Sequence, residues 1–178
     1  MDFDRIIEER RSIRQYNADR TISIVSIEKL IACAQEAPTW KNSQTGRYYV
    51  AIGDESKKQV LECLAQQNQK VAESASALIV TTFVSHRSGF ERSGEPTNEL
   101  KDGWGCYDLG IQNAFLLLKA TDMGIDSIVL GLRDADALRH VLNIPSEEII
   151  VSVIALGYRD NDVMRPKRRQ MADILHVM

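Results

Sequence analysis

The chain has 178 residues, of which 44% are hydrophobic and 26% charged, a composition typical of one globular domain. No stretch approaches the roughly 20 apolar residues that span a bilayer, and the N-terminal MDFDRIIEERR lacks the apolar core of a signal peptide. The net charge is −3, and the three scattered cysteines provide neither a disulfide framework nor a zinc-binding spacing, which favours a cytoplasmic setting in which each is a small buried apolar residue.

The first part of the chain alternates between helical and strand-like patterns. Apolar residues recur at helical spacing over residues 2–11 and again after Ser26, a candidate N-cap, up to Pro38. Residues 47–52 are rich in strand-forming side chains and predict a strand. A single helix is predicted over 55–74.

The middle of the chain contains its most apolar segments. Residues 77–84 (ALIVTTFV) predict a buried central strand. The polar segment 85–103 has no periodicity, and a loop of that length is usually functional or mobile. Residues 104–123 form an unusually apolar helical pattern, ended by Gly124, which predicts a helix that is either central to the core or part of a subunit interface.

The C-terminal part completes an α+β pattern. We expect a short strand at 127–130, a helix capped by Asp134 and ending near Leu142, and an apolar strand at 149–156. The element order predicts one domain over residues 1–178, with a mixed or antiparallel sheet of four to five strands flanked by helices. The polar tail, residues 158–178, is long enough to reach a neighbouring subunit.

Basic residues are concentrated in two short segments. RRSIR (10–14) and RPKRR (165–169) hold seven basic residues and no acid, while the remaining 15 basic and 25 acidic residues leave the rest of the chain at −10. A nucleic-acid binder is usually basic across a whole face, so two cationic spots on an acidic body suit a small anion better. The alternatives are a solvated surface and, for residues 10–14, arginines that close the first helix.

Two further segments have ligand-binding potential. The turn APTWKNSQ (37–44) gathers amides, hydroxyls and an indole that are able to read the edge or cover the face of a heterocycle, although turns favour such residues anyway. Gly131 follows a predicted strand and allows the backbone to approach a ligand, or simply forms the turn. There is no GxGxxG and no P-loop lysine, so neither a Rossmann dinucleotide site nor a P-loop is supported.

Five motifs occur in one order: RRSIR, APTWKNSQ, DLG (108–110), GIDSIVLG (124–131) and LGYRD followed by RPKRR. Over nearly the whole chain this order resembles the nitroreductase family of FMN-dependent oxidoreductases. The resemblance implies a homodimer with two FMN sites at its interface and NAD(P)H as the reductant. The family often continues its turn with Pro-Trp where this chain has Thr45-Gly46, so Trp40 or Tyr48 is expected to provide that wall.

The resemblance also assigns the cofactor-binding residues. Those expected at the FMN phosphate, ribityl chain and pyrimidine edge are Arg10, Arg11, Ser12 and Arg14, with Lys167 and Arg169 completing the phosphate site. Those expected from the partner subunit are Pro38, Thr39, Trp40 and Asn42, with Gln44 close by, and the backbone of Val129, Leu130 and Gly131 is expected near flavin N5. Residues 85–103 would cover the substrate.

The implied activity is hydride transfer from NAD(P)H through the flavin to small oxidised acceptors such as nitroaromatics or quinones, by a ping-pong mechanism. Arg14 would stabilise negative charge on the reduced flavin, and no catalytic side chain and no metal are expected. The alternatives are other flavin chemistry (dehalogenation, desaturation or flavin fragmentation), a non-enzymatic anion-binding module, and a ligand-free dimerisation domain.

Overall fold

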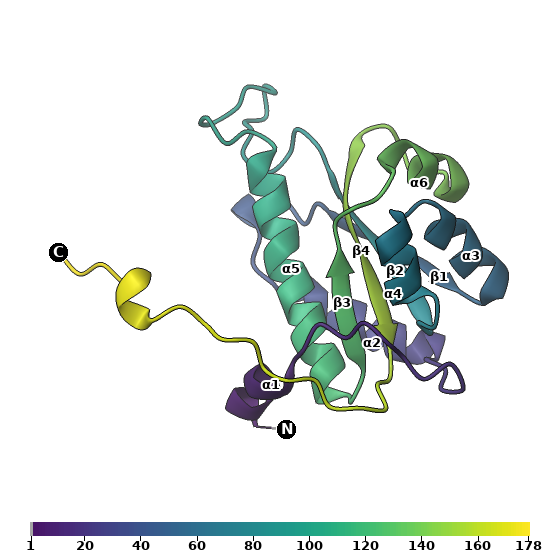
Figure 1. Cartoon of the computed structure of the whole chain (residues 1–178). Coiled ribbons are helices and arrows are strands. Elements are labelled where there is room, and N and C mark those ends of the chain that lie inside the picture. Colours follow the sequence, from purple (N-terminus) through teal and green to yellow (C-terminus); the bar gives the residue numbers. More distant parts are fainter. Residues whose placement is uncertain (1) are drawn as a thin grey trace.

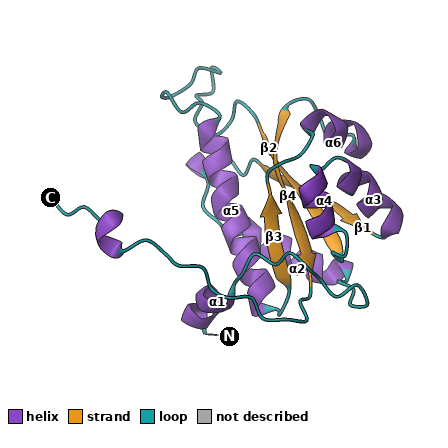
Figure 2. Ribbon diagram, in the orientation of Figure 1, coloured by secondary structure: helices purple, strands orange, loops and turns teal. Residues whose placement is uncertain are grey.

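The structure, a computed structural model, describes residues 2–178 and has the predicted α+β architecture (Figure 1; Figure 2). Its regular elements in chain order are α1 (Phe3–Glu9), α2 (Ile24–Gln35), the 3₁₀ turn η1 (Trp40–Asn42), β1 (Gly46–Ile52), α3 (Asp54–Glu62), α4 (Gln66–Ala72), β2 (Ala77–Val84), α5 (Gly103–Asp122), β3 (Asp126–Leu130), α6 (Ala135–Leu142), β4 (Glu148–Gly157) and η2 (Met171–Asp173).

The four strands form one sheet in the order β1-β2-β4-β3, and every neighbouring pair is antiparallel. The two central strands, β2 and β4, are the continuous apolar runs of the sequence, and almost all of their residues are buried. Their register shifts once, between Thr81 and Thr82. The predicted α+β sheet is therefore confirmed, with four strands and a wholly antiparallel arrangement.

Helices cover both faces of this sheet, so the chain has two cores. Leu30 of α2 and Leu116 of α5 pack with Ile79 and Ile154 on one face. On the other face α3, α4 and α6 cover the sheet, and Val60 and Leu138 belong to this second core. Figure 1 shows α5 on one side of the sheet and α3, α4 and α6 on the other.

Two details of the predicted helices are wrong. The helix expected over 55–74 is divided into α3 and α4, because residues 63–65 bond to residues 132–134 instead of continuing the helix. The backbone N–H of Ala65 donates to Leu132 O at 3.1 Å. The N-cap of α2 is Ser23, whose side chain accepts from the backbone N–H of Ser26, and not Ser26 itself.

The long helix α5 confirms the helix predicted over 104–123, and Gly124 follows its C-cap with a positive φ of 69°. Its inner side is buried, but its outer side exposes Tyr107, Gly110 and Ala114. The expectation that each cysteine is buried is wrong for Cys106, which is exposed on this helix. No helix within residues 2–178 is long and apolar enough to cross a membrane.

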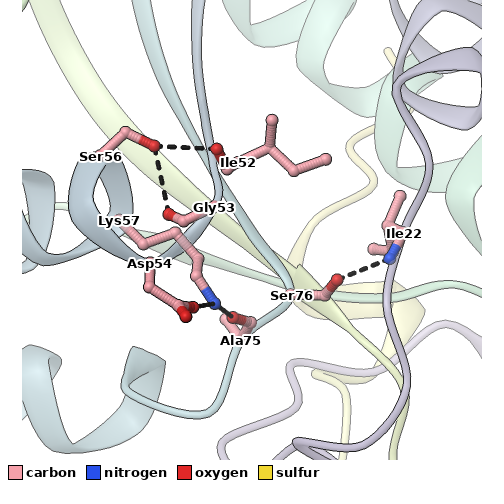
Figure 3. A network of polar contacts seen from close by, with 8 residues as sticks. All are labelled: Ile22, Ile52, Gly53, Asp54, Ser56, Lys57, Ala75 and Ser76. Atoms are coloured by element: carbon pink, nitrogen blue, oxygen red, sulfur yellow. Dashed lines mark hydrogen bonds and ion pairs between the residues drawn. The ribbon is translucent and has the colours of Figure 1, made fainter.

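A polar network closes the sheet edge where β1 turns into α3 (Figure 3). The ammonium of Lys57 donates to Ala75 O at 3.3 Å and lies 3.5 Å from a carboxylate oxygen of Asp54. The hydroxyl of Ser76 accepts from the backbone N–H of Ile22 at 2.6 Å. Gly53 takes a φ of 95° between the strand and the helix, a conformation that favours glycine. The Lys57 contact fastens the chain before β2 to α3, and the Ser76 hydrogen bond fastens it to the segment before α2.

Candidate functional site

The first basic segment leaves α1 and runs beside β3. Ser12 pairs with Ser127 in a parallel bridge, and the backbone N–H of Ile13 donates to Ser127 O at 3.0 Å. Arg10 is the C-cap residue of α1, where its backbone N–H donates to Ile6 O at 3.0 Å. The RRSIR and GIDSIVLG motifs, more than a hundred residues apart in the sequence, therefore lie side by side.

The second basic segment returns to the first. The pKa of the Arg10 guanidinium is lowered by burial and by the positive charges of Arg168 and Arg11, so the C-terminal tail brings Arg168 near Arg10. Arg165 lies 3.8 Å from Glu8 of α1. Like charges held together at a partly buried position raise the local positive potential, which is the property an anion site requires.

The basic residues of these two segments differ in their surroundings. One guanidinium nitrogen of Arg11 donates to Glu8 O and Arg10 O, which is the helix-closing contact that the sequence left as an alternative. Arg14 is exposed, as are Lys167 and Arg169. The sequence did not indicate Arg168, because a run of adjacent basic residues does not reveal which of them faces residue 10.

The turn after α2 has an unusual backbone. Lys41, Asn42 and Gln44 all have positive φ values, of 45°, 55° and 49°, which are uncommon for residues other than glycine. The hydroxyl of Thr39 accepts from the backbone N–H of Gln44 at 3.1 Å, and Arg47 donates to Gln44 O at 3.0 Å. Strained backbone of this kind is concentrated at ligand sites.

A buried carboxylate holds this turn in place. Asp108 of α5 is 3% exposed, and its Oδ2 accepts from the backbone N–H of Trp40 at 2.9 Å and from the hydroxyl of Ser88 at 2.7 Å. The Ser88 hydroxyl is also 2.7 Å from the hydroxyl of Ser43. The turn, α5 and the 85–103 segment thus share one buried polar centre. The sequence analysis named Asp108 only as part of the DLG motif, although a carboxylate on an apolar helix itself indicates buried polar partners.

The Trp40 side chain packs against residues of its own chain. Its ring centroid lies 4.6 Å from that of Trp104, whose indole N–H donates to Asn98 Oδ1 at 2.9 Å. The indole nitrogen of Trp40 is buried and has no hydrogen-bond partner within residues 2–178. Pro38, by contrast, is exposed at the surface.

The end of β3 leads into an exposed glycine. Leu130 is buried in the core, whereas Val129 is 45% exposed on the other face of the strand. Gly131 is exposed, and a Cβ built on it would meet no atom within 4 Å. This space leaves the backbone at Gly131 open to the approach of a ligand.

Within one chain, the candidate residues form two groups that lie far apart. Residues 10–14 and the tail lie near α1, which Figure 1 shows beside the C-terminal end of α5, whereas the Trp40 turn is bonded to Asp108 near its N-terminal end. A helix of 20 residues is about 30 Å long. Residues 10–14 and 37–44 of the same chain therefore lie at opposite ends of α5. Within residues 2–178 there is also no group of three His, Cys, Asp or Glu residues arranged to hold a metal ion.

Comparison with known proteins gives consistent matches. The family model described as the nitroreductase family matches residues 7–158. A protein of Archaeoglobus fulgidus, provisionally named NADH dehydrogenase/NAD(P)H nitroreductase, is 31% identical over 163 residues, covering 86% of this chain and 83% of the relative. A nitrobenzene nitroreductase of Ectopseudomonas oleovorans is 23% identical over 200 residues, covering 90% and 88%.

Solved structures share the fold. A protein of Exiguobacterium sibiricum, provisionally described as a nitroreductase and crystallised in complex with FMN, superposes with a TM-score of 0.87 at 22% identity, covering 100% of this chain and 98% of that one.

Proposed function

The chain belongs to the nitroreductase family of FMN-dependent oxidoreductases, and from that premise we propose that residues 1–178 form one domain of a homodimer that binds FMN between its subunits. It passes hydride from NAD(P)H to small oxidised acceptors, nitroaromatics or quinones, by a ping-pong mechanism. The names of these relatives support the reductant and the acceptor class. Three free cysteines favour a cytoplasmic setting.

The convergence of the two basic segments at the end of α1 is the observation that carries this proposal. Two basic segments from opposite ends of an otherwise acidic chain meet where α1 ends: Arg165 of the tail lies 3.8 Å from Glu8 of α1, and burial, together with the charges of Arg168 and Arg11, lowers the pKa of Arg10. A phosphate there relieves the repulsion and accepts bidentate hydrogen bonds from guanidinium groups. Arg10, Ser12, Lys167 and Arg169 are the residues we assign to the FMN phosphate and ribityl chain.

The separation of the two groups of residues supports a two-chain site. Residues 10–14 with 129–131 come from one subunit, and the turn Pro38, Thr39, Trp40, Asn42 and Gln44 comes from the partner. The exposed outer side of α5, with Tyr107, Gly110 and Ala114, is a face on which two copies would pack closely.

When bound, FMN supplies the hydride-accepting and hydride-donating chemistry. The protein's own groups bind and orient it. Arg14 provides positive charge at the pyrimidine edge, and one of its guanidinium nitrogens donates to Ser12 O at 3.2 Å. Gly131 has room for its backbone to approach the ring, Val129 and Leu130 are assigned beside it, and residues 85–103 cover the substrate. No side-chain acid or base is assigned.

The absorption spectrum of the purified protein tests the proposal. We expect yellow protein whose flavin bands bleach when NADH or NADPH is added without oxygen, and recover when nitrobenzene or a quinone is added. A colourless protein that does not bind added FMN would contradict the proposal. Bound FMN that neither NADH nor NADPH reduces would favour the other flavin chemistries.

The phosphate site has its own test. The double variant Arg10→Ala with Arg169→Ala should release FMN, with the dissociation constant measured by flavin fluorescence. Arg5→Ala is a matched control, because Arg5 is an exposed arginine of α1, the helix that ends at Arg10, and it pairs with Glu9 at 2.5 Å. Full retention of FMN by the double variant would mean that the phosphate lies elsewhere.

A further inference from the structure

A polar hollow lies outside the residues assigned to FMN. It has a volume of about 410 Å³ and is formed by the start of β1, the end of β2 and residues 86–94. Ser43 of the strained turn borders it, so the hollow adjoins the surface proposed to line the partner's flavin. Its size falls within the range of small-molecule sites.

The charges around this hollow are unbalanced. Arg47, Arg87 and Arg92 line it, and Glu91 is its one acidic residue. Lys41 already pairs with that carboxylate, at 3.2 and 3.3 Å from its two oxygens. Within residues 2–178 no carboxylate forms an ion pair with any of the three guanidinium groups. The hollow therefore attracts anions.

The segment that carries two of these arginines is held in a defined shape. Phe90 is buried and pairs with Pro96 in an antiparallel bridge, and the hydroxyl of Thr97 donates to Gly89 O at 2.8 Å. Ser88, 1% exposed, is anchored to Asp108. Arg87 and Arg92 are thus presented from a fixed loop, which lowers the entropic cost of binding a ligand between them.

We infer that this hollow binds the phosphate groups of the nicotinamide dinucleotide, with Arg87 and Arg92 as ligands, and that the protein therefore favours NADPH over NADH. The inference rests on the proposed function, which supplies the dinucleotide. The diphosphate is common to both reductants, but the 2′-phosphate of NADPH adds a charge of about −1.5 to −2. Guanidinium groups bind such phosphates bidentately, and Phe90 and Val84 provide apolar surface for the adenosine.

Steady-state kinetics test this assignment. The wild-type protein should have a higher kcat/KM with NADPH than with NADH. The double variant Arg87→Gln with Arg92→Gln should raise the KM for NADPH about tenfold or more, the scale of a lost hydrogen bond between charged groups. The KM for NADH should rise less, and kcat at saturation should stay within about twofold, because the hydride transfer itself is untouched. Arg87→Lys with Arg92→Lys retains the charge and should recover part of the loss.

Controls separate this inference from the proposed function. Lys58→Gln removes an exposed positive charge on α3, away from the hollow, and should leave both KM values unchanged. The FMN dissociation constant of the double glutamine variant should equal that of the wild type. A fall in FMN affinity instead would assign the hollow to the cofactor and overturn the inference. An unchanged KM for NADPH in a yellow, reducible protein would overturn it while the proposed function stands.

Direct binding gives a readout that does not depend on turnover. In isothermal titration calorimetry, NADP⁺ should bind the wild-type protein more tightly than NAD⁺, and the double glutamine variant should lose that difference. Rising salt concentration should weaken NADP⁺ binding, because exposed charges are screened. Equal affinities for the two dinucleotides in the wild type would contradict the inference, whether or not FMN is bound.

Discussion

The smallest unit that organises the site is a single carboxylate. Asp108 joins the Trp40 amide and the Ser88 hydroxyl, at 2.9 and 2.7 Å, in a buried position. Asp108→Ala removes the acceptor of both the Trp40 amide and the Ser88 hydroxyl, so we expect the free energy of unfolding to fall by about 2–4 kcal/mol and FMN affinity to fall with it. Asp108→Asn keeps an acceptor oxygen and should lose less than half as much.

Urea denaturation and FMN titration measure both effects. Glu28→Ala, at an exposed position of α2, is the control and should change neither quantity. If Asp108→Ala lowered stability but bound FMN as tightly as the wild type, the carboxylate would support the fold without positioning the turn.

The pKa of Tyr49 gives a prediction about how the free energy of unfolding depends on pH. Burial, together with the hydrogen bond that its hydroxyl donates to Glu148, raises the pKa of Tyr49 to about 12. In the unfolded chain its pKa is about 10. Between these values the unfolded state has lost a proton that the folded state keeps, so the free energy of unfolding should fall as the pH rises from 10 to 12.

Urea denaturation at pH 9 and pH 11 measures this loss. Tyr49→Phe should reduce the difference between the two values. It should not abolish it, because burial also raises the pKa of Tyr16 and Tyr48. Identical pH dependence in the variant and the wild type would show that Tyr49 titrates normally.

Residues of the site differ in how far the sequence could predict them. Arg10 and Arg168 belong to conspicuous basic runs, so the runs were predicted, but only the fold shows that the charge of Arg168 lowers the pKa of Arg10. Ser88 looked like one polar residue in a polar loop. Its role depends on Asp108, 20 residues further along the chain, and no local pattern encodes that contact.

At the scale of elements, apolar runs were the reliable signal. The strand predicted over 77–84 matches β2, and the one predicted over 149–156 lies within β4, because a strand buried on both faces needs apolar residues throughout. The break between α3 and α4 was missed because Val60 of α3, Leu64 between the helices and Ala72 of α4 all belong to one core, so the apolar periodicity continues across it. The bonds that cause the break come from residues 132–134.

The outer side of α5 gives a prediction about assembly. A Cβ at Gly110 would meet no atom of its own chain within 4 Å, so the fold of one subunit tolerates a larger side chain there. If two copies pack on this face, Gly110→Glu places a charge in their interface. We expect the variant to elute as a monomer of about half the wild-type mass and to lose FMN.

Size-exclusion chromatography with light scattering measures the mass, and circular dichroism should show unchanged helix content. Ala32→Glu makes a similar change on the exposed side of α2 and should remain dimeric. A dimeric, FMN-bound Gly110→Glu protein would place the interface elsewhere.

The whole molecule consists of a packed body and a tail that leaves it. Residues 160–178 are exposed throughout and run away from the sheet in Figure 1. This tail nevertheless carries large apolar side chains, including Met164 at 90% exposed and Met171 at 66%. The sequence predicted a tail able to reach a neighbour. In the proposed dimer the surface that buries those side chains belongs to the partner, so the path of the tail could not be derived from one chain.

Deleting residues 163–178 removes most of the tail and tests what it contributes beyond the packed body. The body should keep its circular dichroism spectrum and unfold cooperatively, because none of the deleted residues is buried. The dimer should dissociate at higher protein concentration than the wild type, and FMN affinity should fall at least about tenfold, since basic phosphate ligands and apolar contacts are lost together.

A variant with Lys167, Arg168 and Arg169 all changed to Gln keeps the apolar side chains. It should lose FMN affinity but remain dimeric, as measured by analytical ultracentrifugation. A truncated protein that binds FMN and dimerises like the wild type would show that the tail serves neither purpose.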